Sequence, residues 1–147
     1  MPTDRAFLAE NRRQSMRLRT VVDRLTDADL GRPVSHGWTV AETLLHLAFW
    51  DLRAAVLIER FARLGAAPSP ADVEVLNDTV HAMTTAFPPH AVARLAVEAA
   101  ARVDQGLQSM PDHLMEAVPA MGHPFSLTRH VHRAEHLDEI DRALEKR

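Results

Sequence analysis

The segment TVAETLLHLAFWDLRAAVLIERFARLG, which spans Thr39–Gly65, decides the fold class of this chain. It opens with a capping box, in which the Thr39 hydroxyl and the Glu42 carboxylate each satisfy a free backbone N–H at a helix start. From Leu44 to Phe49 the residues are apolar around most of a helical circumference. The segment therefore predicts a helix from Thr39 to about Leu64 that lies at the centre of the molecule.

Helical periodicity and turn-forming residues divide the rest of the chain into four further helices. The segments 26–38 and 111–125 are rich in turn formers and are expected to be irregular connections. Ser69 is the expected N-cap of the one short helix, with Pro70 at its first position. Four long helices, one short helix and no convincing β-alternating run predict an all-α four-helix bundle with one additional short helix. The expected bounds of these further helices are Asp4 to Leu25, Pro70 to Ala86, His90 to Met110 and Ser126 to Leu144.

Composition limits the kind of protein that this chain can be. A length of 147 residues fits one domain, residues 1–147, and the net charge of −3 gives no reason to expect a nucleic acid or an anionic membrane as partner. The absence of cysteine excludes disulfides, thiolate metal ligands and a cysteine nucleophile. The N-terminus lacks the apolar region of a signal peptide, and no apolar run approaches the ~18 residues of a membrane span. These features favour a cytoplasmic protein.

Two histidines near the end of the chain have the spacing of a metal-binding pair. His132 and His136 lie four residues apart in the last helix, so both imidazoles point to the same side and are close enough to share one ion. The same spacing serves zinc in the HExxH enzymes, although Arg133 takes the place of the glutamate of that motif. His130 points about 160° away from His132 around the helix and is not expected to join the pair. The alternative is that both histidines are incidental polar surface.

A third histidine, His46, lies in the apolar stretch TLLHLAFWD of the central helix. A buried imidazole without a partner is costly, so His46 is expected to bind either a backbone carbonyl or an ion that faces the pair on the last helix. Glu42, one turn earlier, has two candidate roles: it caps the helix, or it holds the second ring nitrogen of His46. Trp50, one turn later, is expected in the core or in the wall of a pocket.

Two motifs of this chain resemble those of a known family. GWTVAETLLHLAFWD, followed far downstream by HRAEHLDEID, resembles the DinB/YfiT-like superfamily, in which a four-helix bundle holds one divalent metal through three histidines. The resemblance extends over nearly the whole chain and includes the LTDADL turn after the first helix. The matching residues are Trp38, Thr39, Val40, His46 and Leu47 in the first motif and His132 and His136 in the second.

The resemblance implies that His46, His132 and His136 bind one divalent ion, either zinc, nickel, iron or manganese. Branches of the family use a low-molecular-weight thiol, such as mycothiol or bacillithiol, as cosubstrate. By resemblance, the chain is a metal-dependent S-transferase or isomerase that acts on a small electrophile, and a homodimer is expected. The chain departs from the family pattern at Glu139, where many relatives have glutamine, and this affects the expected chemistry of the pocket rather than the choice of ligands.

Two other classes of function remain open at this point. A noncatalytic bundle would keep the three histidines for structure or for sensing a ligand. A DNA-binding regulator would use the basic first helix, but this reading conflicts with the acidic net charge, and the arginines of that helix can equally form a solvated face. The arginines concerned are Arg12, Arg13, Arg17 and Arg19.

Other polar residues are candidates for the edge of a pocket. Asn77, Asp78 and His81 of the short helix are expected at its mouth or on the surface, with His81 as a substitute ligand or proton shuttle. His113 and His123, both in the segment 111–125, are expected either to close over one end of the bundle or to be solvated.

Overall fold

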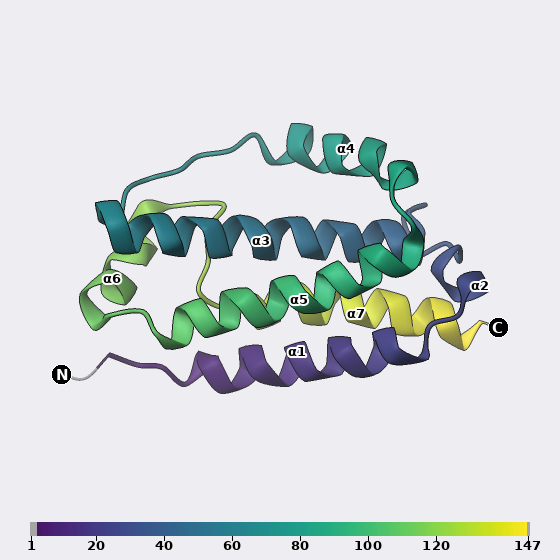
Figure 1. Cartoon of the computed structure of the whole chain (residues 1–147), viewed down its shortest axis with the longest axis horizontal. Helices are drawn as coiled ribbons and strands as arrows, with labels where there is room; N and C mark the ends of the chain where they lie inside the picture. The colour runs from purple at the N-terminus through teal and green to yellow at the C-terminus, as the bar shows by residue number, and fades with distance from the viewer. Residues whose placement is uncertain (1–2, 147) are drawn as a thin grey trace.

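The computed structural model describes residues 3–146 and shows a bundle of helices with no β-strand in that range (Figure 1). The all-α fold predicted from the sequence is confirmed. Four long helices form the bundle, one shorter helix lies outside it, and short helical turns occupy the connections. The long helices are α1 (Phe7–Arg24), α3 (Val40–Leu64), α5 (Pro89–Gln108) and α7 (Arg129–Glu145); the others are α4 (Val73–Met83), α2 (Asp27–Leu30), α6 (Asp112–Ala117) and the 3-10 helices η1 (Thr84–Ala86) and η2 (Val118–Met121).

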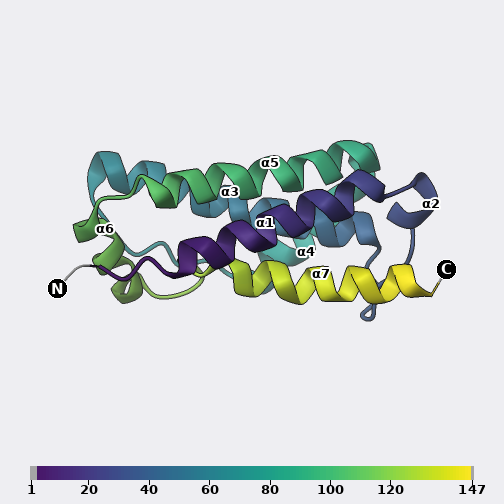
Figure 2. The same cartoon turned by 90° about the horizontal axis from the view of Figure 1, so that it is seen from below.

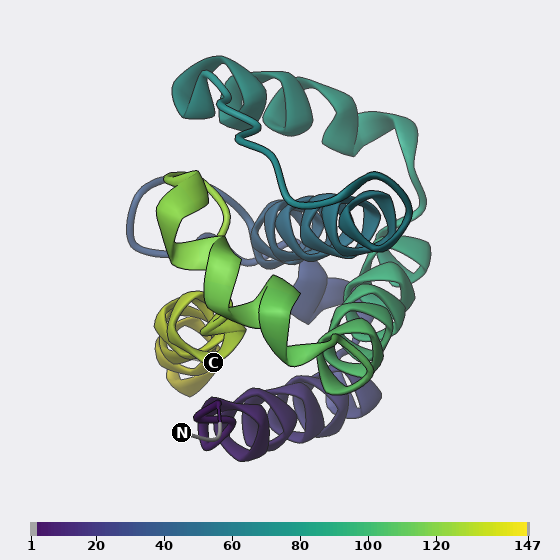
Figure 3. The ribbon, with the colours of Figure 1, turned by 90° about the vertical axis from the view of Figure 1, so that its left-hand side faces the viewer.

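The arrangement of the helices places α3 between α4 and the rest of the bundle. Viewed end-on, α1, α3, α5 and α7 surround a common core, and α4 lies on the outer side of α3 (Figure 3). From below, α1 lies against both α5 and α7 (Figure 2). Helix α7 also contacts α3, so the two helices that carry the predicted histidines are neighbours. In the part of the chain that the structure describes, no helix has both the length and the apolarity needed to cross a membrane.

The start of α3 has the capping box that its sequence predicts. Thr39 Oγ1 accepts a hydrogen bond from the Glu42 N–H at 3.1 Å, and the Glu42 carboxylate accepts one from the Thr39 N–H at 3.3 Å. Val40, Leu44 and Ala48 are completely buried, as expected for a central helix. Small residues of α5 and larger ones of α7 complete this part of the core: Ala96, Ala99, Ala100, Leu137 and Ile140.

Several predicted helix boundaries were wrong, and the competing contacts are visible. Ser69 does not cap the short helix, because its hydroxyl and carbonyl both accept hydrogen bonds from Arg53 of α3. Asp72 is the N-cap instead, accepting from the Val75 N–H, so α4 begins later than Pro70.

The start of the last helix is also later than predicted. The Ser126 hydroxyl lies 2.9 Å from that of Thr128 and accepts from the Thr128 N–H, which holds a local turn before α7. The two connections expected to be irregular contain short helices: α2, opened by a capping box between Thr26 and Asp29, lies in segment 26–38, and α6 lies in segment 111–125.

Candidate metal centre

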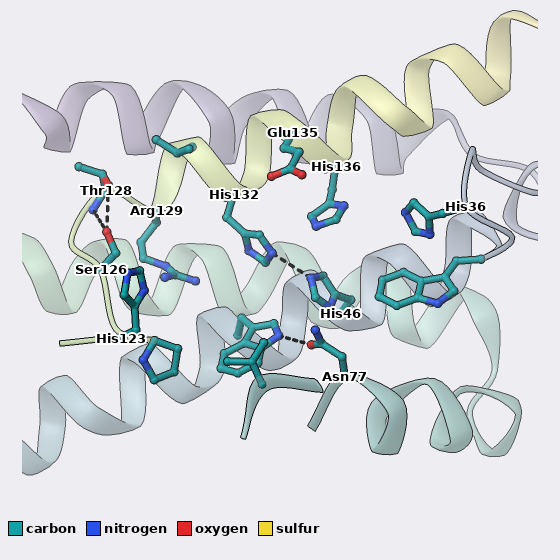
Figure 4. A pocket seen from close by; sticks show the side chains of 15 residues that line it. His36, His46, Asn77, His123, Ser126, Thr128, Arg129, His132, Glu135 and His136 are labelled. Carbon is teal, nitrogen blue, oxygen red and sulfur yellow. Dashed lines mark hydrogen bonds between the residues drawn. The ribbon is translucent and has the colours of Figure 1, made fainter. Parts of the chain in front are cut away.

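Three histidines from two helices meet inside the bundle (Figure 4). His46 comes from α3, and His132 and His136 come from successive turns of α7. The Nε2 atoms of His46 and His132 lie 2.9 Å apart, and the centroids of the three rings are 4.7–4.8 Å from one another. One candidate ligand atom from each ring lies within 4.8 Å of the other two. The structure therefore brings together the three residues that the sequence predicts as ligands.

The spacing and the protonation of these rings both fit a divalent ion. Two nitrogens that are each 2.0–2.1 Å from a shared ion lie about 2.9–3.4 Å apart, and the His46 to His132 distance is in that range. Burial lowers the pKa of His46 to about 4, and the electrostatic effect of the neighbouring His136 lowers it further. Burial, again with His136 and then His46, lowers the pKa of His132 to about 2. At neutral pH these imidazoles are uncharged, the form that binds metal.

A buried carboxylate lies behind one of the three histidines. Glu139 Oε1 is 3.3 Å from His136 Nδ1, and Glu139 Oε2 is 2.7 Å from His36 Nε2. Burial lowers the pKa of His136, and the charges of Glu139 and Glu135 oppose that shift. The two groups lack hydrogen-bond geometry, and His136 Nδ1 has no hydrogen-bond partner among the described residues, so the contact between them is electrostatic. Glu139 thus places a negative charge beside His136, at the ring nitrogen through which a carboxylate orients a histidine ligand when it accepts a hydrogen bond.

His36 is a part of this region that the sequence pattern did not reveal. It lies in the loop before α3, and its ring is 4.8 Å from that of Trp38. With His136 and Glu139 it forms a second group whose candidate ligand atoms lie within 4.8 Å of one another. Only the i, i+3 spacing of His136 and Glu139 could have suggested this group, since nothing local links His36 to α7.

Glu42 does not support His46. Its carboxylate caps α3 and lies 3.0 Å from His81 Nδ1, and the structure gives it no contact with His46 within residues 3–146. His81 stacks against Trp38 with ring centroids 6.2 Å apart and is exposed. The capping role predicted for Glu42 is the one observed, and His81 lies outside the three-histidine cluster.

A cavity of about 650 Å³ opens onto the histidines. Trp50 is buried and forms part of its wall, and its Nε1–H donates to Asn77 Oδ1 at 2.8 Å. Of the alternatives left open for Asn77 and His123, the position at a pocket is the one observed, because both residues line the cavity. Asp78 and His113 are not among the residues that line the cavity, and both are exposed.

An ion-pair network fills the bundle beside the cavity. Arg133, which stands where the HExxH motif has its glutamate, is completely buried and donates to Asp51 at 3.0 Å and to Asp104 at 2.8 Å. Arg129 donates from Nε to the other oxygen of Asp51 at 2.9 Å. The guanidinium of Arg133 is therefore engaged in ion pairs within the core. Position 133 thus provides no general base in place of the glutamate of the HExxH motif.

Two of the basic residues of the first helix, Arg13 and Arg17, form ion pairs within the protein. Arg17 binds Asp138 and Asp141 of α7, both at 2.7 Å, and Arg13 pairs with Glu10 within α1. These contacts join α1 to α7 and neutralise part of the charge. They agree with a structural and solvated role for the α1 arginines rather than with a nucleic-acid surface.

Comparison with known proteins identifies the family. A sequence model of the DinB superfamily matches residues 10–137, which include all three clustered histidines and end before Glu139. Searches of curated proteins and of solved structures found no match. Since the family model covers most of the chain, the chain belongs to the DinB superfamily.

Proposed function

We propose that this protein is a metal-dependent enzyme in which His46, His132 and His136 hold one divalent ion, either zinc, nickel, iron or manganese. It transfers or rearranges a group on a small electrophile and uses a low-molecular-weight thiol, with mycothiol as the first candidate. The observation that carries the proposal is the cluster of three uncharged imidazoles at the base of a cavity of about 650 Å³. A cavity of this size accommodates a small molecule.

The chemistry of the proposal depends on both the ion and the protein. When bound, such an ion lowers the pKa of a coordinated thiol, so that a thiolate nucleophile is available at neutral pH. The protein has no cysteine, so the sulfur comes with the cosubstrate. Trp38 and Trp50 provide apolar walls, and the Glu139 carboxylate lies 3.3 Å from His136 Nδ1. The proposal places the reaction in the cytoplasm, where thiols are kept reduced.

The test is thiol-dependent consumption of an electrophile by metal-loaded protein. Mycothiol, bacillithiol and glutathione are each supplied with a maleyl-type acid or a halogenated aromatic compound, and the His132→Ala and His136→Ala variants serve as metal-free references. Turnover that requires both a thiol and the histidines supports the proposal. Absence of thiol binding by calorimetry and of turnover with all three thiols would reject it, and turnover that survives both substitutions would reject the role of the metal.

A second candidate function is a noncatalytic bundle in which the ion has a structural role. The observation that favours it is the position of the cluster: His46 and the other two histidines belong to different helices, so a shared ion would link α3 to α7. In that case metal raises the melting temperature, but no thiol binds. The homodimer expected from the family stays a prediction, which light scattering of the purified protein can check.

A further inference from the structure

We infer that Arg129 is the anion-recognition residue of the cavity and that the molecule bound beside the three histidines carries a carboxylate. This inference deepens the proposed function and rests on it for the identity of the bound molecule. The carboxylate belongs either to the thiol cosubstrate or to the electrophile.

Arg129 lies beside the histidines and faces the same cavity. It is the first residue of α7, one turn before His132, so the two side chains project from the same side of the helix. Figure 4 shows its guanidinium directed between His132 and His123 into the space that the pocket residues enclose. The charge of Arg129 contributes to the lowered pKa of His132, after burial and the neighbouring histidines, which is consistent with this proximity.

The guanidinium has donors that the protein does not use. The Arg129 side chain is only 7% exposed, and its Nε–H donates to Asp51 Oδ1 at 2.9 Å. Within residues 3–146 the structure gives its two terminal nitrogens, Nη1 and Nη2, no hydrogen-bond acceptor. Among the described residues, the only completely buried side-chain nitrogens or oxygens without a hydrogen-bond partner are His46 Nδ1 and His136 Nδ1, so the Arg129 donors keep accessible surface where Arg129 lines the cavity. A guanidinium edge binds a carboxylate through two parallel hydrogen bonds. A carboxylate in the cavity would satisfy these donors.

The charges around Arg129 leave a positive excess at this end of the cavity. Asp51 is shared between Arg129 and Arg133, and Arg133 also binds Asp104. Burial lowers the pKa of Arg53, and repulsion by the nearby Arg129 lowers it further. The Arg53 guanidinium lies over the Trp50 ring rather than against a carboxylate. The three guanidinium groups of Arg53, Arg129 and Arg133 therefore outnumber the two carboxylates of Asp51 and Asp104.

The other end of the cavity carries a negative charge, that of Glu135. Glu135 is exposed and lies close enough to His136 for its charge to oppose the lowering of that pKa. Figure 4 shows Glu135 above His136, on the far side of His132 from Arg129. The anion-binding end of the cavity is thus the end formed by Arg129.

The backbone at the start of α7 does not provide the anion site. The N–H groups of Arg129, His130 and Val131 donate to Leu127 O at 3.0 Å, Asn11 Oδ1 at 2.8 Å and Thr128 O at 3.3 Å. Because these donors are occupied, recognition of an anion depends on the Arg129 side chain.

The experiment compares acids with uncharged analogues by calorimetry on zinc-loaded, full-length protein. The first pair is 3-mercaptopropionate and its methyl ester, and the second is maleate and maleamide. We expect at least one acid to bind about 10–100-fold more tightly than its uncharged analogue, as charge-assisted hydrogen bonds predict. In Arg129→Gln that preference should fall to within about threefold while the zinc content and the binding of the uncharged analogue are unchanged. Arg102→Gln, which removes an exposed arginine paired with Glu59, should keep the wild-type preference.

The outcomes separate this inference from the proposed function. A preference in the first pair alone assigns the carboxylate to the thiol, and one in the second pair alone assigns it to the electrophile. Equal binding of acid and uncharged analogue in both pairs, or a preference that survives Arg129→Gln, overturns the inference. If Arg129→Gln does not fold, Arg129→Lys should retain part of the preference, and the wild-type ratios still decide. If cobalt-loaded protein shows no sulfur-to-metal absorption band with either thiol but prefers maleate to maleamide, thiol chemistry fails and anion recognition stands.

Discussion

The Nε2 atoms of His46 and His132 lie 2.9 Å apart although 86 positions separate the two residues in the sequence. Without an ion, one of these nitrogens must donate a proton to the other, because two lone pairs at this distance repel each other. With His136 as a third ring, the protein holds together three imidazoles, two buried and one half-buried, whose pKa values are all lowered, first by burial. This arrangement costs free energy in the metal-free protein and is compensated when a divalent ion binds.

The first prediction concerns Glu139, whose carboxylate lies 3.3 Å from His136 Nδ1. Glu139→Ala should weaken zinc binding by about 10–100-fold, the usual effect of removing an outer contact of a histidine ligand. Glu139→Gln keeps an acceptor oxygen and should cost less than about tenfold. Competition with a chromophoric chelator measures both affinities. Glu145→Ala, an exposed glutamate of the same helix, is the control. Wild-type affinity in Glu139→Ala would show that this carboxylate does not support the site.

The second prediction concerns the pH dependence of the metal-free protein. The unfolded chain protonates His46 near its ordinary pKa of about 6.5, whereas the folded protein does so at about 4, so the unfolded state binds more protons between these values. The free energy of unfolding should therefore decrease as the pH falls from about 6.5 towards 4, with His46 alone responsible for roughly 1–2 kcal/mol at pH 5.

Urea unfolding between pH 7 and 5 measures this dependence. His46→Gln should flatten the decrease, and His113→Gln, which removes an exposed imidazole outside the cluster, should leave the wild-type slope. Identical slopes for wild type and His46→Gln would mean that His46 titrates alike in the folded and unfolded states.

The third prediction concerns the buried ion-pair network. Asp51→Ala leaves Arg129 and Arg133 facing each other without their shared carboxylate, and should lower the free energy of unfolding by about 3–5 kcal/mol. Glu59→Ala breaks the exposed pair with Arg102 and should change stability by less than about 1 kcal/mol. Urea denaturation of the two variants gives both values. A loss below about 1 kcal/mol for Asp51→Ala would contradict the structural role of the network.

The sequence was sufficient to predict the features that depend on local spacing. The capping box at Thr39 and the apolar circumference of its helix predicted the central helix, and the i, i+4 spacing of His132 and His136 predicted a pair of rings on one face. His46 stood out because an imidazole among leucines needs a partner. Each of these features follows from the periodicity of a single helix.

Features that depend on contacts between distant segments could not be predicted in this way. His36 approaches Glu139 because a loop folds back beside α7, and no pattern in the sequence encodes that approach. Arg129 and Asp51 are likewise ordinary charged residues until the packing of α3 on α7 buries them together. The Ser69 cap was mispredicted for the same reason, since a distant arginine, Arg53, binds the atoms that a cap would use.

The most direct test of the account is the metal content of purified protein, measured by elemental analysis after loading and removal of free ions. Wild type should retain one equivalent of a divalent ion per chain. His46→Ala, His132→Ala and His136→Ala should each lose it, while His130→Ala, which alters a neighbouring histidine outside the cluster, should retain it. Helical circular dichroism confirms that each variant is folded. Folded variants that lack His46 or His132 and still hold a full equivalent of metal would contradict the three-histidine site, as would a wild type that retains no metal under any loading condition.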